Sequence, residues 1–257
     1  MEPSRTPMPP LELNAVVAVD VVLFTVRAAE RVEDAWQVLL VQLDDPAFAG
    51  RWALPGVLVH ADETFDAAAR RALRTKAGLD AAGWYLEQLG TFGDPCRDSR
   101  GRVISVAHLA IERSDELTLL PGGGVLRADW IPVRQVQETD LAFDHGAILR
   151  RAAARIQSKL RYSWVAFQLL PDRFTLPELR AVYAAILDPA ILRLNTSNFK
   201  KAFAALFASG VLVSMGERAE RGRPGRPGDL YAFTGPLAGT WERELPWHER
   251  KDTDGVH

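Results

Sequence analysis

The chain has 257 residues, of which 47% are hydrophobic and 25% are charged, a balance typical of globular proteins. No apolar run approaches the roughly 18 residues that a membrane span needs, and the polar, Pro-rich residues 1–10 lack the pattern of a secretory signal. The single cysteine, Cys96, excludes an internal disulfide and a cysteine-based zinc cluster. We therefore expect a cytoplasmic protein of two domains.

The charge is unevenly distributed along the chain. The formal net charge is −2, yet residues 155–233 hold 12 Lys and Arg against 6 Asp and Glu. The remaining residues therefore carry an excess of acids. A basic C-terminal part on an acidic body predicts an anionic partner for the C-terminal part.

Strands around one helix are predicted for an N-terminal domain over residues 13–144, after an N-terminal arm (1–12) that we expect to be disordered. The Val-rich segment 14–26 is typical of a strand buried on both faces. Further strands are expected at 35–42, within 50–60, and at 84–92, 102–112 and 125–133. Small apolar residues at helical spacing predict a helix over 63–78 that ends at Gly78. This pattern indicates α/β layers around one sheet.

A helix over residues 145–160 is predicted to link this domain to a second one, because its apolar residues repeat on one face. Three short helices then follow at 163–170, 176–187 and 195–208, and the second begins with a capping-box pattern at Thr175 and Glu178. Two alternating segments, 211–215 and 230–233, flank a loop rich in Gly, Pro and Arg. Helices followed by a hairpin with a basic tip predict a winged helix over 161–234. The polar tail, 235–257, is expected to be poorly ordered.

The segment from Leu54 to Leu79 resembles the Nudix box, a loop-helix-loop motif with the pattern G-x5-E-x7-R-E-U-x-E-E-x-G-U, in which U is apolar. The matching residues are Glu63, Arg71, Leu73, Gly78 and Leu79, whereas Val57 replaces the first glycine and Ala72, Thr75 and Lys76 replace the three helical glutamates. The LPG before the helix and the spacing within it argue against the alternative, an unrelated amphipathic helix.

The replaced glutamates carry the chemistry of that motif. Spaced i, i+3 and i+4, they lie on one helix face and offer carboxylate oxygens to Mg²⁺, which activates water against a diphosphate. Ala72 supplies no ligand, Thr75 at best a weak one, and Lys76 places a positive charge where the cation would lie. We therefore predict neither a metal site nor hydrolase activity.

The third short helix of the second domain has the character of a recognition helix. Its aromatic residues form one apolar stripe, and polar residues gather at its N-terminus, where such a helix presents side chains to the major groove. We assign DNA contacts to Thr196, Ser197, Asn198, Lys200 and Lys201. The alternative is a solvated helix start.

The loop between the last two strands carries Arg221, Arg223 and Arg226 among Gly and Pro residues. It resembles the core of an AT-hook, and a slim basic loop suits the negative potential of an A·T-rich minor groove. We assign these three residues to DNA binding. The alternative is a basic surface hairpin without a partner.

These motifs, together with the runs at 85–110 and 144–160 and the GDLY that follows the basic loop, resemble the Nudix-related transcriptional regulators (NrtR) over nearly the full chain. The resemblance implies a homodimer that represses genes of NAD metabolism. It also implies that ADP-ribose, or a related nucleotide, binds in the former Nudix pocket as the effector. Because a helix-turn-helix half-site is short, we expect an operator with an inverted repeat.

With the metal ligands lost, a diphosphate must be neutralised by cations. The candidates are Arg51, Arg71, Lys76 and Arg102, with Trp52 as an aromatic surface for a base or ribose. Structural salt bridges of Arg71 and Arg102 stay open as an alternative. Glu63 is expected to be a carboxylate at the helix start and His108 a strand residue, and nothing marks Cys96 as a nucleophile.

Three other functions stay open. One is an ADP-ribose pyrophosphatase with an accessory DNA-binding domain, which an assay with Mg²⁺ would distinguish. Another is a regulator of the same architecture that responds to a sugar. The last is a binding module whose basic domain contacts RNA instead of duplex DNA. No cofactor other than the effector, and no membrane contact, is expected.

Overall fold

The computed structural model describes residues 15–48, 50–113, 117–137, 140–193, 196–219 and 228–235. The expected N-terminal arm, the tail beyond residue 235 and the wing arginines Arg221, Arg223 and Arg226 lie outside these ranges. No helix within the described ranges is long and apolar enough to cross a membrane.

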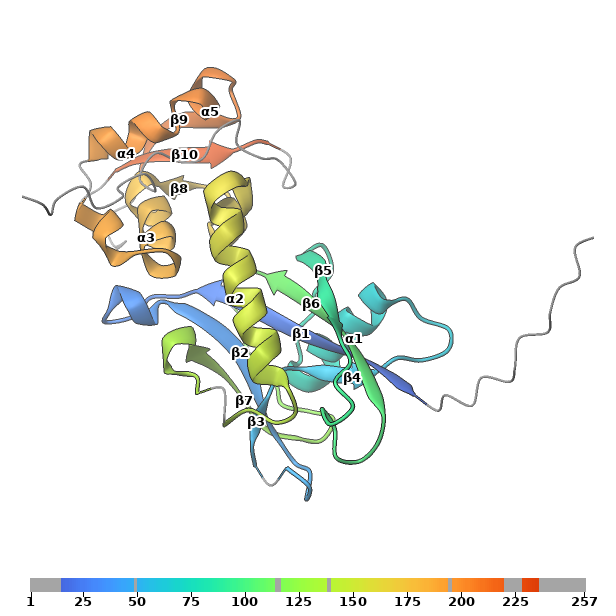
Figure 1. Ribbon diagram of the computed structural model, residues 1–257. Helices are drawn as coiled ribbons and strands as arrows, with labels where there is room; N and C mark the ends of the chain where they lie inside the picture. Colours follow the sequence, from blue (N-terminus) through green and yellow to red (C-terminus); the bar gives the residue numbers. More distant parts are fainter. Residues whose placement is uncertain are drawn as a thin grey trace, which may run out of the picture.

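A seven-stranded sheet forms the centre of the N-terminal domain (Figure 1). Its strands are β1 (Val16–Val26), β2 (Trp36–Leu43), β3 (Trp52–Ala53), β4 (Gly56–Leu58), β5 (Tyr85–Phe92), β6 (Val103–Ile111) and β7 (Val125–Pro132). The order is β3-β2-β1-β6-β5, with β4 paired to β1 and β7 to β2; β1 and β6 run parallel, and the other pairs are antiparallel. Each long strand begins and ends within two residues of its predicted bounds.

One helix covers each face of this sheet. Because side chains alternate along a strand, Val19 and Val21 of β1 pack against α1 (Phe65–Ala77), whereas Val22 and Phe24 share a core with α2 (His145–Tyr162). The predicted α/β layers around one sheet are therefore confirmed, and they form an α/β/α sandwich. Short 3-10 helices, η1 (Val32–Asp34) and η2 (Val133–Gln135), follow β1 and β7.

The ends of α1 follow from local chemistry. Thr64 is the N-cap, and its side chain accepts the backbone N–H of Ala67. Gly78 ends the helix in the left-handed conformation, with φ of +71°, where a side chain would be strained. The helix stop predicted at this glycine is confirmed.

The C-terminal domain is a winged helix, as predicted. Its elements are the 3-10 helices η4 (Trp164–Leu169) and η5 (Pro189–Arg193), the helices α3 (Leu176–Ile186), α4 (Thr196–Ala202) and α5 (Ala204–Ala208), and the strands β8 (Phe174–Thr175), β9 (Leu212–Arg218) and β10 (Asp229–Phe233). The strands form a sheet of order β8-β10-β9. Both hydrogen bonds of the predicted capping box, between Thr175 and Glu178, are present.

Two helix predictions were wrong in detail. The segment predicted as the first short helix is a 3-10 helix, whose tight turns allow Val165, Ala166, Phe167 and Leu169 all to be buried. The predicted helix over 195–208 is interrupted at Phe203, which has φ of −100° and ψ of 10°. The interruption places the buried Phe203 ring in the core beside Phe199, at 5.0 Å between ring centroids.

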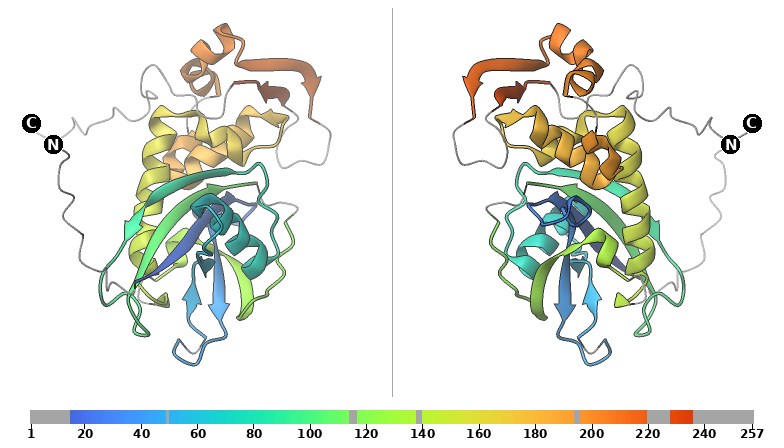
Figure 2. Two further views of the ribbon diagram at one scale, coloured as in Figure 1. Left: turned by 90° about the vertical axis from the view of Figure 1, so that its right-hand side faces the viewer. Right: turned by 90° about the vertical axis from the view of Figure 1, so that its left-hand side faces the viewer.

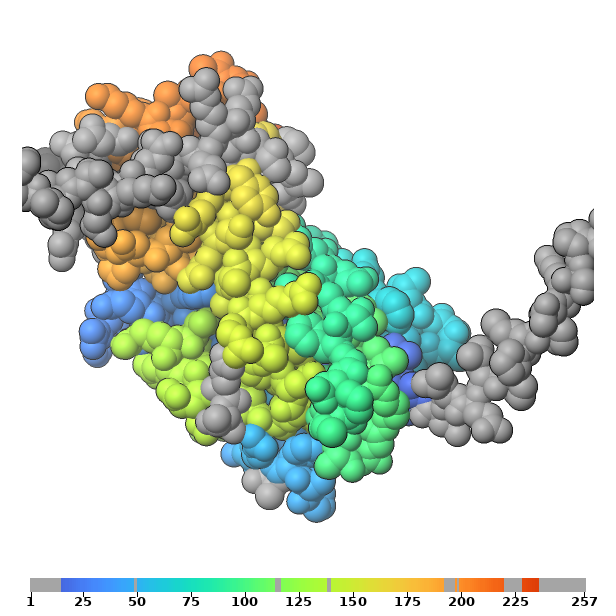
Figure 3. Space-filling view, in the orientation of Figure 1, coloured from blue at the N-terminus to red at the C-terminus, as the bar shows by residue number. Residues whose placement is uncertain are grey.

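The two domains share one hydrophobic core along α2. Ile148 and Ala152 pack into the sheet domain, and Ile156 and Leu160 continue the same core into the winged helix. The side chain of Gln157 also donates a hydrogen bond to the carbonyl of Ile186, at the end of α3, at 3.1 Å. In addition, α3 contacts η1 and β2. Figure 2 shows α2 running beside the sheet and up to the winged helix, and Figure 3 shows its outer face at the surface.

Candidate functional site

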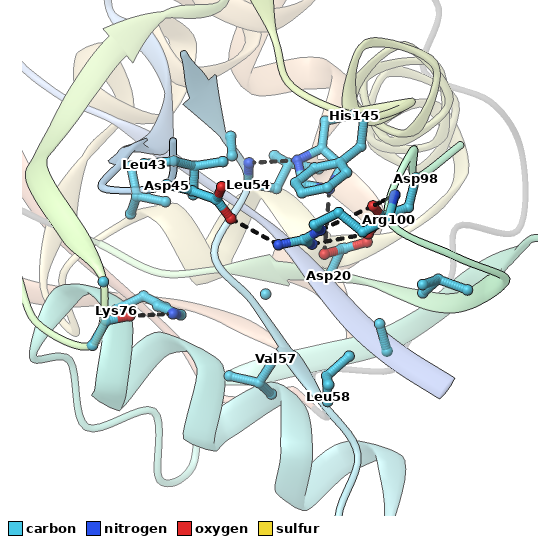
Figure 4. A pocket seen from close by; sticks show the side chains of 18 of the residues that line it. Asp20, Leu43, Asp45, Leu54, Val57, Leu58, Lys76, Asp98, Arg100 and His145 are labelled. Atoms are coloured by element: carbon cyan, nitrogen blue, oxygen red, sulfur yellow. Dashed lines mark hydrogen bonds and ion pairs between the residues drawn. The ribbon is translucent and has the colours of Figure 1, made fainter. Parts of the chain in front are cut away.

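A cavity of about 300 Å³ opens between β1, the β3–β4 segment, the end of α1, the loop 93–102 and the start of α2 (Figure 4). Its lining is mixed in character. The charged or titratable residues are Asp20, Asp44, Asp45, Lys76, Arg97, Asp98, Arg100 and His145, and the apolar ones include Leu43, Leu54, Val57, Leu58 and Phe143.

A buried ionic network forms one wall of the cavity. The Arg97 side chain is only 3% exposed, and its Nη2 donates to Asp20 Oδ2 at 3.0 Å and to Asp144 Oδ1 at 2.8 Å. Its Nε lies 3.1 Å from both carboxylate oxygens of Asp144. The hydroxyl of Ser105 donates to Asp20 Oδ2 at 2.6 Å. The network thereby joins β1, β6, the loop 93–102 and the residue before α2.

His145 completes this network in one tautomer. The backbone N–H of Leu54 donates to His145 Nδ1 at 2.9 Å, so the ring proton lies on Nε2, which is 3.4 Å from Asp20 Oδ1. Burial alone would raise the pKa of Asp20, but His145, the Ser105 hydroxyl and Arg97 outweigh it and lower that pKa to about 2. Asp20 is therefore ionised near neutral pH.

The glycine of the LPG sequence makes room for this carboxylate. A Cβ on Gly56 would lie 2.2 Å from Asp20 Oδ1 and 3.2 Å from the Val19 carbonyl oxygen. A side chain at this position would thus collide with the buried network, which gives a physical reason for glycine there.

Two further cations, Arg100 and Lys76, line the cavity. Arg100 binds Asp98 through Nε at 3.0 Å and Nη2 at 2.9 Å, and reaches Asp45 through Nη1 at 2.7 Å. Its side chain is 51% exposed, and its guanidinium lies over the rings of Phe48 and Phe143. Lys76 of α1, whose pKa is lowered by burial, donates to the Gly123 carbonyl. Figure 4 shows Lys76 and Arg100 on different sides of the cavity.

Of the five residues predicted to bind a ligand, Lys76 lines this cavity. Among the described residues, Arg51, Trp52, Arg71 and Arg102 are not part of its lining. The Arg51 Nη2 donates to the Leu141 carbonyl at 2.6 Å, the Arg102 Nη1 to the Gly93 carbonyl at 2.7 Å, and the Trp52 ring lies below the Arg127 guanidinium. Ligand binding by these residues stays a prediction.

Arg71 is held by Glu63, the other charged residue that matches the Nudix box pattern. Its Nε donates to Glu63 Oε2 at 2.9 Å, and its Nη2 to Glu63 Oε1 and to the Leu58 carbonyl. The bonds from Arg71, aided by the His60 N–H, lower the pKa of Glu63 to about 2. Glu63 precedes the N-cap of α1, so the expected carboxylate at the helix start is confirmed.

The box positions do not fit a Mg²⁺ ion. Ala72 is fully buried against the sheet, the Thr75 hydroxyl donates to the Arg71 carbonyl at 2.8 Å, and the Lys76 ammonium donates to the Gly123 carbonyl, so none of the three positions offers a carboxylate. Across the described ranges, no group of three His, Cys, Asp or Glu side chains could hold a metal ion. His108 is a buried strand residue, as expected.

Most of the cavity's charged residues were not predicted from the sequence. Residues 94–101 received no functional assignment, although this loop supplies Arg97, Asp98 and Arg100. One signal was present: Asp20 is a lone carboxylate within the Val-rich run VVAVDVVLF, where an unpaired charge would be costly. A charge at that position predicts a buried partner but does not identify it.

The predicted DNA-binding face is only partly described. Ser197, Lys200 and Lys201 are exposed on α4, and the Lys200 ammonium lies over the rings of Phe207 and Tyr231. Thr196 and Asn198 belong to α4, but their side chains lie outside the described part of the chain. DNA contact by these five residues stays a prediction.

Fold and site together define a two-domain protein, in which a Nudix domain with an altered box is joined by α2 to a winged helix. The family model of the NUDIX domain matches residues 16–152, and that of the NrtR DNA-binding winged helix domain matches residues 166–233. The chain belongs to the NrtR family of Nudix-related transcriptional regulators.

Two curated relatives match different shares of the chain. An ADPR responsive transcriptional repressor, NtrR, of Acinetobacter baylyi is 32% identical over 86% of this chain and 82% of its own length. An ADP-ribose pyrophosphatase of Methanocaldococcus jannaschii is 31% identical over 54% of this chain and 74% of its own length. The repressor therefore matches both domains, whereas the pyrophosphatase matches about half of the chain.

The solved structures of Shewanella oneidensis NrtR are similar to the whole chain. The protein alone is 29% identical with a TM-score of 0.71, and its complex with a 27mer DNA is 28% identical with a TM-score of 0.68; each covers 89% of this chain and 99% of that one. Its NUDIX domain with ADP ribose is 30% identical with a TM-score of 0.50, covering 58% of this chain and 94% of that one.

Proposed function

We propose that this protein is a transcriptional repressor that binds operator DNA through its winged helix and senses ADP-ribose, or a related nucleotide, in the cavity of its Nudix domain. One observation carries the proposal. The same chain combines a Nudix domain whose cavity does not fit Mg²⁺ with a winged helix, and the two domains share one hydrophobic core. The relatives that match both domains support it. By family resemblance, the regulated genes belong to NAD metabolism.

A test of this function measures two equilibria. Calorimetry with ADP-ribose reports effector binding, and anisotropy of a labelled operator duplex reports DNA binding with and without ADP-ribose. We expect ADP-ribose to bind and to weaken DNA binding, and linkage requires DNA to weaken ADP-ribose binding by the same factor. If ADP-ribose does not bind even at millimolar concentration, a sugar becomes the leading effector.

Within the cavity, Lys76 and Arg100 are the cations best placed to receive a diphosphate, because both line it and lie on different sides. Replacing Arg100 by Ala is expected to weaken ADP-ribose binding about tenfold or more, the range of a lost charged hydrogen bond. Arg74→Ala, an exposed arginine on α1, is the control and should bind normally. An Arg100→Ala variant with wild-type affinity would contradict this placement.

Arg51, Trp52, Arg71 and Arg102 stay predicted ligand residues. Each has contacts within the protein, as Lys76 and Arg100 do, but none of the four belongs to the lining of the cavity. Alanine variants measured in the same titration show which of them contribute.

We expect no hydrolysis of ADP-ribose with Mg²⁺ or Mn²⁺, because the box supplies no carboxylates to hold the metal. An active Nudix hydrolase in the same buffer is the control. The similarity to a pyrophosphatase keeps the enzyme as the second candidate function. Turnover by the purified protein of even about 1 s⁻¹, a common enzyme rate, would establish that alternative.

The proposed repressor is a homodimer on an inverted-repeat operator, since one winged helix reads only a short half-site. We expect light scattering to give twice the mass of the chain, and the two half-sites to lie about one or two helical turns apart. A monomer at concentrations where DNA is bound would contradict this expectation. RNA of the same sequence serves as a competitor and should not displace the duplex.

A further inference from the structure

The residue immediately before α2 is an aspartate whose carboxylate does not cap the helix. Asp is a preferred N-cap residue because its side chain can accept the free N–H groups of the first turn. Asp144 occupies the N-cap of α2 but makes no such bond. Both of its oxygens face Arg97 instead, at 2.8 to 3.1 Å. The Asp144–Arg97 ion pair therefore holds the start of α2 against the wall of the cavity.

Arg97 stands between this helix and the cavity. Its Nε donates to Asp144, and its Nη2 donates to both Asp144 and Asp20. Its Nη1 donates to no acceptor in the described part of the chain. Arg97 also lines the cavity. A guanidinium has five N–H donors, so an anion in the cavity can bind Arg97 and compete with Asp144 for it.

The far half of α2 belongs to the winged helix. Ile156 and Leu160 are fully buried in the core that contains Val165 and Phe167. Because an α-helix is held together by hydrogen bonds from turn to turn, a displacement of its first turn would be carried along the helix to this core.

A second contact joins the same helix to strand β5, which precedes the cavity loop. Glu87 of β5 binds Lys159 and Arg155 of α2, at 3.5 Å for Arg155 Nη1. Strand β5 ends at Phe92 and leads directly into the loop that carries Arg97. The loop therefore contacts α2 at the start of the helix, and the strand that leads into the loop contacts its second half.

We infer that Asp144 is a positioning residue that couples the effector cavity to the winged helix. With the cavity empty, Arg97 holds the start of α2 through Asp144. An anionic effector draws the guanidinium toward itself, the first turn of α2 is released, and the winged helix shifts with it. This inference rests on the proposed function, since it describes how the same cavity regulates DNA binding.

The test is a measurement of coupling in the full-length protein with ADP-ribose as probe. The coupling factor is the ratio of the operator Kd with saturating ADP-ribose to the Kd without it, and about 5- to 150-fold is typical of allosteric proteins. Asp144→Asn keeps the size and the capping capacity of the residue but removes its charge, while Asp20 still neutralises Arg97. We expect the coupling factor to fall to about twofold or less, because the operator Kd without ADP-ribose should rise toward the value that wild type has with ADP-ribose. ADP-ribose should bind at least as tightly as it does to wild type.

Three further variants make the result specific. Asp144→Glu retains the charge and should recover much of the coupling. Asp144→Ser can still cap a helix but is too short to reach Arg97, so it should behave as Asp144→Asn does and provides a second reading if the Asn variant does not fold. Asp129→Asn removes a carboxylate from an exposed ion pair with Arg127 on β7 and should couple normally.

Each outcome is decisive. If wild type shows no coupling, the proposed function fails, and this inference fails with it. If wild type couples and Asp144→Asn couples equally, only this inference is overturned, and the contact of α3 with η1 and β2 carries the signal. If Asp144→Asn binds ADP-ribose more weakly than wild type, or binds the operator more weakly than ADP-ribose-bound wild type does, Asp144 has a structural role and the inference is again overturned.

Discussion

Asp20→Asn is expected to lower the free energy of unfolding by about 3–5 kcal/mol, the range seen when one partner of a buried ion pair is removed. Asp20 is 5% exposed and accepts from Arg97 and Ser105, with His145 Nε2 3.4 Å away. Asn has the same shape but one oxygen instead of two, and its amide hydrogens would face these donors. Arg97 would also lose half of the negative charge that compensates its burial.

The pH dependence of stability gives an independent check. The folded-state pKa of Asp20 is about 2, below its ordinary value of 3.8. A depressed pKa means that the ionised carboxylate stabilises the fold above about pH 4 and that this contribution is lost as the pH falls toward 2. A shift of nearly two pH units corresponds to about 2–3 kcal/mol. The stability difference between wild type and Asp20→Asn should therefore shrink between pH 4 and the folded-state value.

Urea unfolding of both proteins across this range makes the measurement. Asp129→Asn, in the exposed pair with Arg127, is the matched control and should change stability by no more than about 1 kcal/mol. If Asp20→Asn lowers the free energy of unfolding as little as the control does, the buried network does not stabilise the fold in the way that its geometry indicates.

The elements predicted well from sequence are those with a local signal. Residues 14–26 alternate between two apolar faces, and both faces are covered, one by α1 and the other by α2. The N-terminal boundary of α2 at His145 and the stop of α1 at Gly78 were placed correctly, because a single apolar face and a left-handed glycine are visible without knowledge of the fold.

The elements predicted badly depend on contacts distant in sequence. The break at Phe203 has no breaker residue; it arises because the ring packs beside Phe199 and Tyr183 in the core. Strand β8 has only two residues, and it exists because β10 pairs with it. Neither feature has a periodicity that a sequence window could detect.

The residues of the candidate site show the same difference between local signals and contacts distant in sequence. The motif spacing identified Lys76, which lines the cavity, but also Arg71, whose partner Glu63 lies eight residues earlier in the same motif. The network of Asp20, Arg97 and Asp144 joins residues 47 to 124 positions apart, and nothing local shows that they meet. Pairing rules for buried charge predict that Asp20 has a partner, but only the fold selects Arg97.

Phe203→Ala is expected to abolish operator binding while leaving ADP-ribose binding intact. Phe203 is fully buried in the winged helix, with ring centroids 5.0 Å from Phe199 and 6.0 Å from Tyr183. Truncation of a buried Phe to Ala costs about 3–5 kcal/mol, because the lost apolar contact leaves a cavity. The loss falls at the junction of α4 and α5, so it disturbs the orientation of the helix predicted to read DNA.

Anisotropy with the operator, calorimetry with ADP-ribose and thermal unfolding separate these effects. Phe65→Ala makes the same chemical change at a side chain that is 42% exposed on α1, and it should alter stability by no more than about 0.5 kcal/mol and leave DNA binding unchanged. Because one core runs along α2 through both domains, some loss of stability should also reach the Nudix domain, seen as an earlier midpoint for the whole protein. If Phe203→Ala instead binds the operator with wild-type affinity, the helix that begins at residue 196 does not position the DNA contacts, and another face of the C-terminal domain must carry them.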